Sequence, residues 1–175
     1  MFVNYAAQGV KQQGKPDIVT VKQYHPEVMA SFFLLCKKMN MGWDGLFADN
    51  CPDMIISGYR GHDPDPAVKH SPHGFAIALD IHVSNFDAHI PSNQPVVLDA
   101  QIKWITAATE SGLFTRGGFY PQQNTIHLDI ADPAWMETYN GSRFWVKWGG
   151  VYAGFQILDN AIAYAKQKIM VAANV

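Results

Sequence analysis

Apolar side chains recur at the three- and four-residue spacing of α-helices in three parts of the chain. The first predicted helix opens at His25-Pro26-Glu27, where proline suits the first helical position, and ends near Gly42. The second spans about residues 96–112, and the third spans 151–172. We expect the apolar stripe of the third helix to pack against the core; its members are Val151, Phe155, Leu158, Ile162, Ala165 and Ile169.

Four shorter segments have the alternating or continuously apolar character of β-strands: residues 17–23, 53–59, 74–83 and 124–130. Stretches rich in proline and glycine separate several of these segments and predict loops. Beyond the first short strand, the order along the chain is helix, strand, loop, strand, helix, strand and helix. This order predicts an α+β fold, with a small, mostly antiparallel sheet flanked by helices in a single domain over residues 1–175.

Composition narrows the class of protein. A hydrophobic share of 48% in 175 residues is typical of one globular domain rather than of a disordered chain. The net charge of −2 lacks the basic character that nucleic-acid binding needs. No apolar run approaches the roughly 18 residues of a membrane span, and the N-terminus has no recognisable signal peptide. We therefore expect synthesis in the cytoplasm, no nucleic acid as a partner and no membrane span.

Two short segments carry the candidate chemistry. His73 lies where a loop runs into a predicted strand that bears Asp80, whereas His127 and Asp129 share one face of another strand. If the two strands are neighbours, His73, Asp80 and His127 converge. Two imidazoles and one carboxylate leave the fourth position of a tetrahedral Zn²⁺ open, as in catalytic zinc sites. The spacing alone also fits a second interpretation, in which His73 caps a loop and Asp80 forms a turn or an ion pair.

Three segments in this order resemble a known family: SGYR at 57–60, SPHGFAIALDI at 71–81 and GFYPQQNTIHLDI at 118–130. They are similar to the zinc D-Ala-D-Ala peptidases, which cleave peptidoglycan and share a fold with the hedgehog signalling domain. The family pattern S-x-H-x-x-G-x-A-x-D is matched in register, except that Ala76 replaces the glycine. The H-x-D of the third segment resembles a phage and bacterial branch in which R-x-W follows, and Arg143 to Trp145 corresponds after a longer spacer. The resemblance covers roughly residues 53–146.

The resemblance implies roles for individual residues. Arg60 corresponds to a residue that binds the substrate or the developing oxyanion, which suits a permanent cation with forked donors. Ser71 is expected near the substrate, and Tyr120 is a candidate hydrogen-bond donor to a tetrahedral intermediate. The residues that correspond to the zinc ligands are His73, Asp80 and His127.

The general base is the point at which this sequence departs from the family. Much of the family has an acidic residue three positions before the last histidine or a histidine two before it, but here Asn124 and Thr125 stand there. Neither takes a proton from zinc-bound water near neutral pH. Asp129 either serves as the base or orients a metal ligand without binding the metal itself. His82, on the Asp80 face of its strand, is a further candidate.

The resemblance implies a Zn²⁺-dependent peptidase that hydrolyses peptide bonds in peptidoglycan stem peptides or cross-links. A D-Ala-D-Ala-type carboxypeptidase or an endopeptidase fits this expectation. The lack of a recognisable signal peptide suits a phage lysin that reaches the cell wall on release from the cell. The alternative is a catalytically weak or silent zinc-binding module with a structural or binding role in a phage particle, and Asn124 is its main support.

Overall fold

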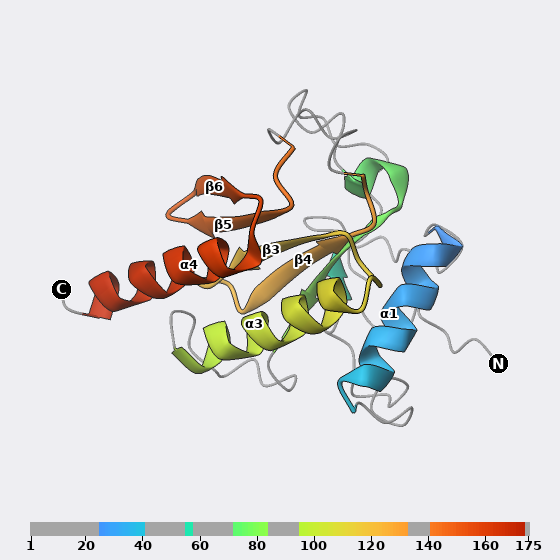
Figure 1. Ribbon diagram of the computed structural model, residues 1–175, viewed down its shortest axis with the longest axis horizontal. Coiled ribbons are helices and arrows are strands. Elements are labelled where there is room, and N and C mark those ends of the chain that lie inside the picture. The colour runs from blue at the N-terminus through green and yellow to red at the C-terminus, as the bar shows by residue number, and fades with distance from the viewer. Residues whose placement is uncertain (1–24, 41–54, 58–71, 84–94, 133–140, 174–175) are drawn as a thin grey trace.

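The protein is described by a computed structural model over residues 25–40, 55–57, 72–83, 95–132 and 141–173 (Figure 1). The predicted strand at 17–23 lies outside these residues. The described helices are α1 (Pro26–Lys38), the short 3₁₀ helix η3 (Pro72–Phe75), α3 (Pro95–Glu110) and α4 (Leu158–Ala173). The described strands are β1 (Ile55–Ser57), β2 (Ala78–His82), β3 (Arg116–Tyr120), β4 (Thr125–Asp129), β5 (Phe144–Trp148) and β6 (Val151–Phe155). The α+β class is therefore confirmed.

Helix α1 begins where the sequence predicts. The His25 ring nitrogen Nδ1 accepts a hydrogen bond of 3.4 Å from the Glu27 amide, and proline follows His25 at the first helical position. The helix ends at Lys38, earlier than the predicted stop at Gly42. Asn40 takes a left-handed backbone conformation with φ of 56°, which is incompatible with a further helical turn.

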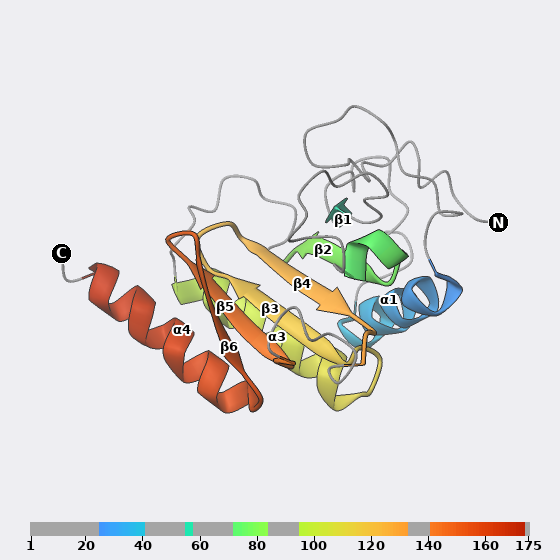
Figure 2. The same cartoon turned by 90° about the horizontal axis from the view of Figure 1, so that it is seen from above.

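The sheet has the strand order β1-β2-β4-β3-β5-β6. Neighbouring strands are antiparallel except for β3 and β5, which are parallel, so the prediction of a mostly antiparallel sheet is confirmed. Figure 2 shows β4, β3, β5 and β6 side by side. A tight connection over residues 121–124 joins β3 to β4 and sets their register, with Tyr120 opposite Thr125. Because this register runs without a shift, side chains on alternate positions of both strands share a face.

The two faces of the sheet differ in chemistry. Buried apolar side chains on one face join those of α1, α3 and α4 in a single core; the strand members are Leu79, Ile81, Phe119, Ile126, Leu128, Phe144 and Val146. Helices α3 and α4 run along this face in Figure 1. Gly117 on β3 allows a close approach of α3, because a Cβ there would lie 2.7 Å from the Ile105 Cγ2 atom. The residues between the apolar ones, among them Asp80 and His127, consequently face the opposite side.

Several predicted boundaries are wrong. Residues 74–83 do not form one strand: η3 and a turn precede β2, which begins at Ala78. The predicted helix at 151–172 divides into β6 and α4, so Val151 and Phe155 belong to a strand. Within α4 the expected core contact is confirmed, since Ala165 and Ile169 are buried. The strands β3 and β5 were not expected. Among the described helices, none is both long and apolar enough to cross a membrane.

Candidate metal centre

His73 is positioned by the turn that precedes β2. In η3 the Pro72 carbonyl accepts a hydrogen bond from the Ile77 amide at 3.1 Å, and the His73 carbonyl accepts one from the Ala76 amide at 3.2 Å. Ala76 adopts a φ of 61°, which reverses the chain tightly before the strand begins. The His73 side chain is buried, and its Nε2 atom lies 3.4 Å from the Asp80 carboxylate. The turn thus brings His73 over a strand residue seven positions later.

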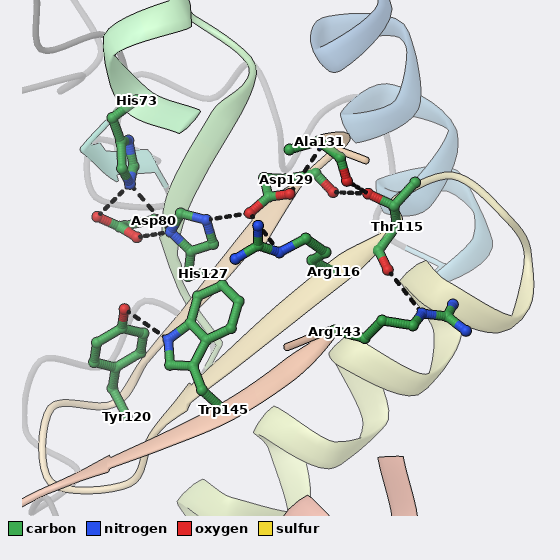
Figure 3. A network of polar contacts seen from close by, with 10 residues as sticks. All are labelled: His73, Asp80, Thr115, Arg116, Tyr120, His127, Asp129, Ala131, Arg143 and Trp145. Atoms are coloured by element: carbon green, nitrogen blue, oxygen red, sulfur yellow. Dashed lines mark hydrogen bonds and ion pairs between the residues drawn. The ribbon is translucent and has the colours of Figure 1, made fainter. Parts of the chain in front are cut away.

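His127 completes this group from the neighbouring strand. It stands opposite Asp80 in the register of β2 and β4, and its Nδ1 atom lies 2.9 Å from Asp80 Oδ1. The same Nδ1 atom lies 3.1 Å from His73 Nε2 (Figure 3). One ligand atom from each of the three residues falls within 4.8 Å of the others. The predicted convergence of His73, Asp80 and His127 is therefore present, and this group could hold a metal ion.

The spacing of these atoms fits a tetrahedral ion. Zn–N bonds of about 2.0–2.1 Å put two tetrahedral nitrogen ligands roughly 3.3 Å apart. The ring nitrogens of His73 and His127 are 3.1 Å apart; His127 Nδ1 lies 2.9 Å from Asp80 Oδ1, and His73 Nε2 lies 3.4 Å from Asp80 Oδ2. Two imidazoles and a carboxylate also form a donor set that Zn²⁺ accepts. The ligand group therefore matches the size and the chemistry of a three-residue metal site.

Asp129 contacts the other ring nitrogen of His127. Its Oδ2 atom lies 2.9 Å from His127 Nε2, and its Oδ1 atom accepts a hydrogen bond of 3.0 Å from the Ala131 amide. The Asp129 side chain is fully buried. Because His127 Nδ1 faces His73 and Asp80 whereas Nε2 faces Asp129, this carboxylate sits behind the ligand. Of the two roles considered for Asp129, this geometry favours the orientation of His127 over proton transfer.

Trp145 and Tyr120 border the ligand group on the same face of the sheet. The Trp145 indole lies across β3 with its ring centre 5.0 Å from that of His127, and it donates a hydrogen bond of 3.2 Å to the Tyr120 hydroxyl. Gly118 lies between them on β3, and a Cβ at Gly118 would overlap the indole. The absence of a side chain at Gly118 thus allows Trp145 to reach His127. In Figure 3 the Tyr120 hydroxyl points toward the side that carries Asp80.

Charge interactions and hydrogen bonds together outweigh burial in setting the pKa values of Asp80 and His127. Burial alone raises the pKa of Asp80, but the charge of His73 and hydrogen bonds with both histidines hold this pKa well below its ordinary value. Burial alone lowers the pKa of His127, yet hydrogen bonds with Asp129 and Asp80 outweigh it, so the pKa is raised. Asp80 is therefore an ionised ligand over the physiological range, whereas His127 holds a proton more firmly than an exposed histidine.

The other predicted site residues are only partly described. Arg60 and Ser71 lie outside the described residues. His82 ends β2 opposite Thr125 in the register, and its side chain is outside the described part. Thr125 donates its hydroxyl hydrogen to the Gln123 carbonyl at 2.8 Å, and Asn124 occupies the turn before β4 with φ of 49°. As expected from the sequence, neither residue type can act as a base near neutral pH.

Arg116 was not among the site residues expected from the sequence. It opens β3 directly opposite Asp129, it is fully buried, and its Nε atom lies 3.6 Å from Asp129 Oδ2. A charged residue at the start of an otherwise apolar strand was the available signal. This signal can be interpreted only with the register of β3 and β4. That register becomes evident only when residues 121–124 are recognised as a hairpin turn. Strand β3 itself contains two adjacent glycines, and glycine is depleted in strands, so its local sequence does not indicate a strand.

Arg143 lies apart from the ligand group. Its side chain is exposed, its Nε donates to the Thr115 carbonyl at 3.5 Å, and Figure 3 shows it beyond Arg116 as seen from His73. Of the segment that resembles R-x-W, only Trp145 borders the candidate site in the described part of the chain.

A scan against protein-family models, a search of curated proteins and a search of solved structures found no match. The likeness to the D-Ala-D-Ala peptidases and to the hedgehog-type fold therefore stays a prediction from the sequence motifs.

Proposed function

We propose that this chain is a zinc-dependent peptidase that hydrolyses peptide bonds in peptidoglycan stem peptides or cross-links. One observation carries the proposal: His73, Asp80 and His127 converge from two sequence segments, with the second nitrogen of His127 held by Asp129. A histidine whose far nitrogen is bonded to a carboxylate is the usual arrangement at protein metal sites. Nitrogen donors favour Zn²⁺ over Mg²⁺ or Ca²⁺, which bind oxygen. The substrate class rests on the motif resemblance.

Three protein ligands leave one tetrahedral position for water or substrate, which is the arrangement of catalytic rather than structural zinc sites. Zinc, when bound by these residues, would lower the pKa of a bound water to about 7 and polarise a scissile carbonyl. Tyr120 borders the ligand group and accepts a hydrogen bond from Trp145 Nε1 through its hydroxyl oxygen, and a tyrosine hydroxyl can both accept and donate. We propose that this hydroxyl donates to the developing oxyanion and that Arg60 binds it or a substrate carboxylate.

Proton transfer has two candidate residues, Asp129 and His82. Asp129 is fully buried behind His127, which suits orientation of the ligand more than removal of a proton from water. His82 is the other candidate that the sequence offers, two residues after Asp80 on β2. Loss of turnover in His82→Gln with full zinc content would assign the base to His82. The same outcome in Asp129→Asn alone would assign it to Asp129.

A second function is favoured by the chemistry at the start of β4. The Thr125 hydroxyl is bonded to a backbone carbonyl, and Asn124 cannot act as a base. A domain with a metal site and no base would serve as a zinc-binding structural or binding module of a phage particle. Such a module would bind zinc as tightly as the peptidase but would produce no new amino termini.

The two functions are separated by an assay on peptidoglycan. The purified chain, loaded with zinc, is incubated with peptidoglycan, and new amino termini are quantified with and without a chelator. A peptidase releases amino termini, loses this activity with the chelator and recovers it when zinc is restored. His73→Ala should abolish release, whereas His25→Ala, at the exposed start of α1, should retain it. No release by any zinc-loaded sample would contradict the peptidase and support the silent module.

A further inference from the structure

Arg116 is a buried cation directly behind the candidate metal centre. Its side chain is about 1% exposed and stands opposite Asp129 across the β3–β4 pair. A guanidinium group is costly to bury unless an anion accompanies it, and removal of that anion is strongly destabilising. The Asp129 carboxylate, 3.6 Å from Arg116 Nε, is an anion that the described part of the chain places beside it. The two charges therefore depend on each other inside the protein.

The same carboxylate oxygen connects Arg116 to the ligand. Asp129 Oδ2 lies 3.6 Å from Arg116 Nε and 2.9 Å from His127 Nε2, whereas Oδ1 accepts from the Ala131 amide. An ionised carboxylate only accepts hydrogen bonds, and a guanidinium only donates them. His127 Nε2 must therefore donate to Asp129, so the lone pair of the neutral ring is on Nδ1. Nδ1 is the atom that faces His73 and Asp80.

The surroundings of Arg116 also restrain the ring itself. The guanidinium lies over the Trp145 indole, 5.1 Å from the ring centre, and the indole in turn lies 5.0 Å from the His127 ring. Arg116 thus reaches His127 by two routes, through Asp129 at the ring edge and through Trp145 beside the ring (Figure 3). A guanidinium on an aromatic face is attracted to the ring by its charge, and its planar shape packs against the ring.

We propose that Arg116 is a positioning residue for the metal centre. It holds the Asp129 carboxylate in place behind His127 Nε2 and thereby presents His127 Nδ1 to the ion. This inference rests on the metal site of the proposed function, and it does not depend on the substrate or on catalysis. A residue that only joined β3 to β4 would affect the stability of the sheet and leave the ligand field of a bound ion unchanged.

The test measures metal binding rather than turnover. Zn²⁺ affinity is determined by competition with a chromophoric chelator, and the ligand field is read from the visible absorption of the Co²⁺-loaded protein. Arg116→Met should weaken Zn²⁺ binding about 10- to 100-fold, as is usual when an outer partner of a metal ligand is lost. It should also change the Co²⁺ spectrum. Arg116→Lys restores the positive charge and should recover most of the affinity.

Two further variants make the test specific. Arg143→Met removes an exposed arginine near the start of β5 and should leave Zn²⁺ affinity and the Co²⁺ spectrum unchanged. Asp129→Asn keeps the size of the side chain but not its charge, and it should weaken binding as Arg116→Met does. The double variant should lose less affinity than the sum of the two single losses, because both changes break the connection through Asp129. If Arg116→Met does not fold, Asp129→Asn and Arg116→Lys decide the question.

The outcomes separate the two proposals. No Zn²⁺ binding by the unaltered chain would overturn the metal site and the proposed function with it. Wild-type binding together with unchanged affinity and an unchanged Co²⁺ spectrum in Arg116→Met, or in Asp129→Asn where the former does not fold, would overturn only the positioning role. Independent, additive losses in the double variant would also overturn it.

Discussion

At the scale of single residues, the site depends on the different partners of the two ring nitrogens of His127. Nδ1 faces His73 and Asp80, whereas Nε2 faces the buried Asp129 carboxylate. Without a metal, hydrogen bonds with Asp129 and Asp80 raise the pKa of the ring despite its burial. A metal at Nδ1 requires the lone pair that the proton occupies in the charged ring. Metal binding and protonation of His127 therefore compete.

This competition predicts that Zn²⁺ binding releases protons near neutral pH. Because the pKa of His127 is raised above its ordinary value of about 6.5, a larger fraction of these rings is charged at pH 7 than of exposed histidines. The pKa of Asp80 is lowered, so this carboxylate is already ionised and releases no proton. The apparent affinity should rise as the pH increases through the raised pKa. Calorimetry of Zn²⁺ binding in buffers of different ionisation enthalpy measures the number of protons released.

Asp129→Asn provides the control for this prediction. The hydrogen bond with Asp129 is the first of the contacts that raise the His127 pKa, so its weakening should reduce the number of protons released at pH 7. Binding heats that do not depend on the buffer in the unaltered protein would contradict the role assigned to His127.

At the scale of elements, strand β3 lies between the core and the site. It carries two adjacent glycines that face opposite sides of the sheet. Gly117 faces the core, where a Cβ would lie 2.7 Å from Ile105 Cγ2 on α3. Gly118 faces the site, where a Cβ would overlap the Trp145 indole. Adjacent residues of a strand point to opposite faces, so the pair admits a helix on one side and an indole on the other. At both positions the absence of a side chain allows a neighbouring group to pack closely against the backbone of β3.

Alanine at each position gives a matched pair of variants. Both substitutions overpack a buried contact, and each should lower the free energy of unfolding by about 1–3 kcal/mol in urea titrations. Gly118→Ala displaces Trp145 from His127 and should also weaken Zn²⁺ binding, by about 10-fold. Gly117→Ala changes only the contact with α3 and should leave Zn²⁺ affinity unchanged. Equal Zn²⁺ affinities in the two variants would contradict the assignment of Trp145 to the site.

At the scale of the whole molecule, local signals explain what the sequence could predict. The start of α1 follows from His25 and Pro26, and the core face of α4 follows from Ala165 and Ile169. Strand β4 lies within a residue of its predicted bounds at each end. These features depend on spacing within one element, which the sequence displays directly.

The features that could not be predicted from the sequence depend on contacts between elements that are distant along the chain. The β5–β6 hairpin turns at Gly149-Gly150, whose φ values of 56° and 82° suit a two-residue turn, yet the apolar positions 151 and 155 also fit a helical spacing. In the site, the three proposed ligands were found from their motifs, because each motif is local. Arg116 was not found, since only the pairing of β3 with β4 places it behind Asp129. The choice of Nδ1 over Nε2 likewise follows from the folded sheet.

The central claim is that the fold assembles one metal site from η3, β2 and β4. The most direct test is the anomalous diffraction of crystals of the zinc-loaded protein, recorded on both sides of the zinc absorption edge. The account predicts one strong peak about 2.0–2.2 Å from His73 Nε2, His127 Nδ1 and an Asp80 carboxylate oxygen. A zinc ion bound elsewhere, or bound through His127 Nε2, would contradict it.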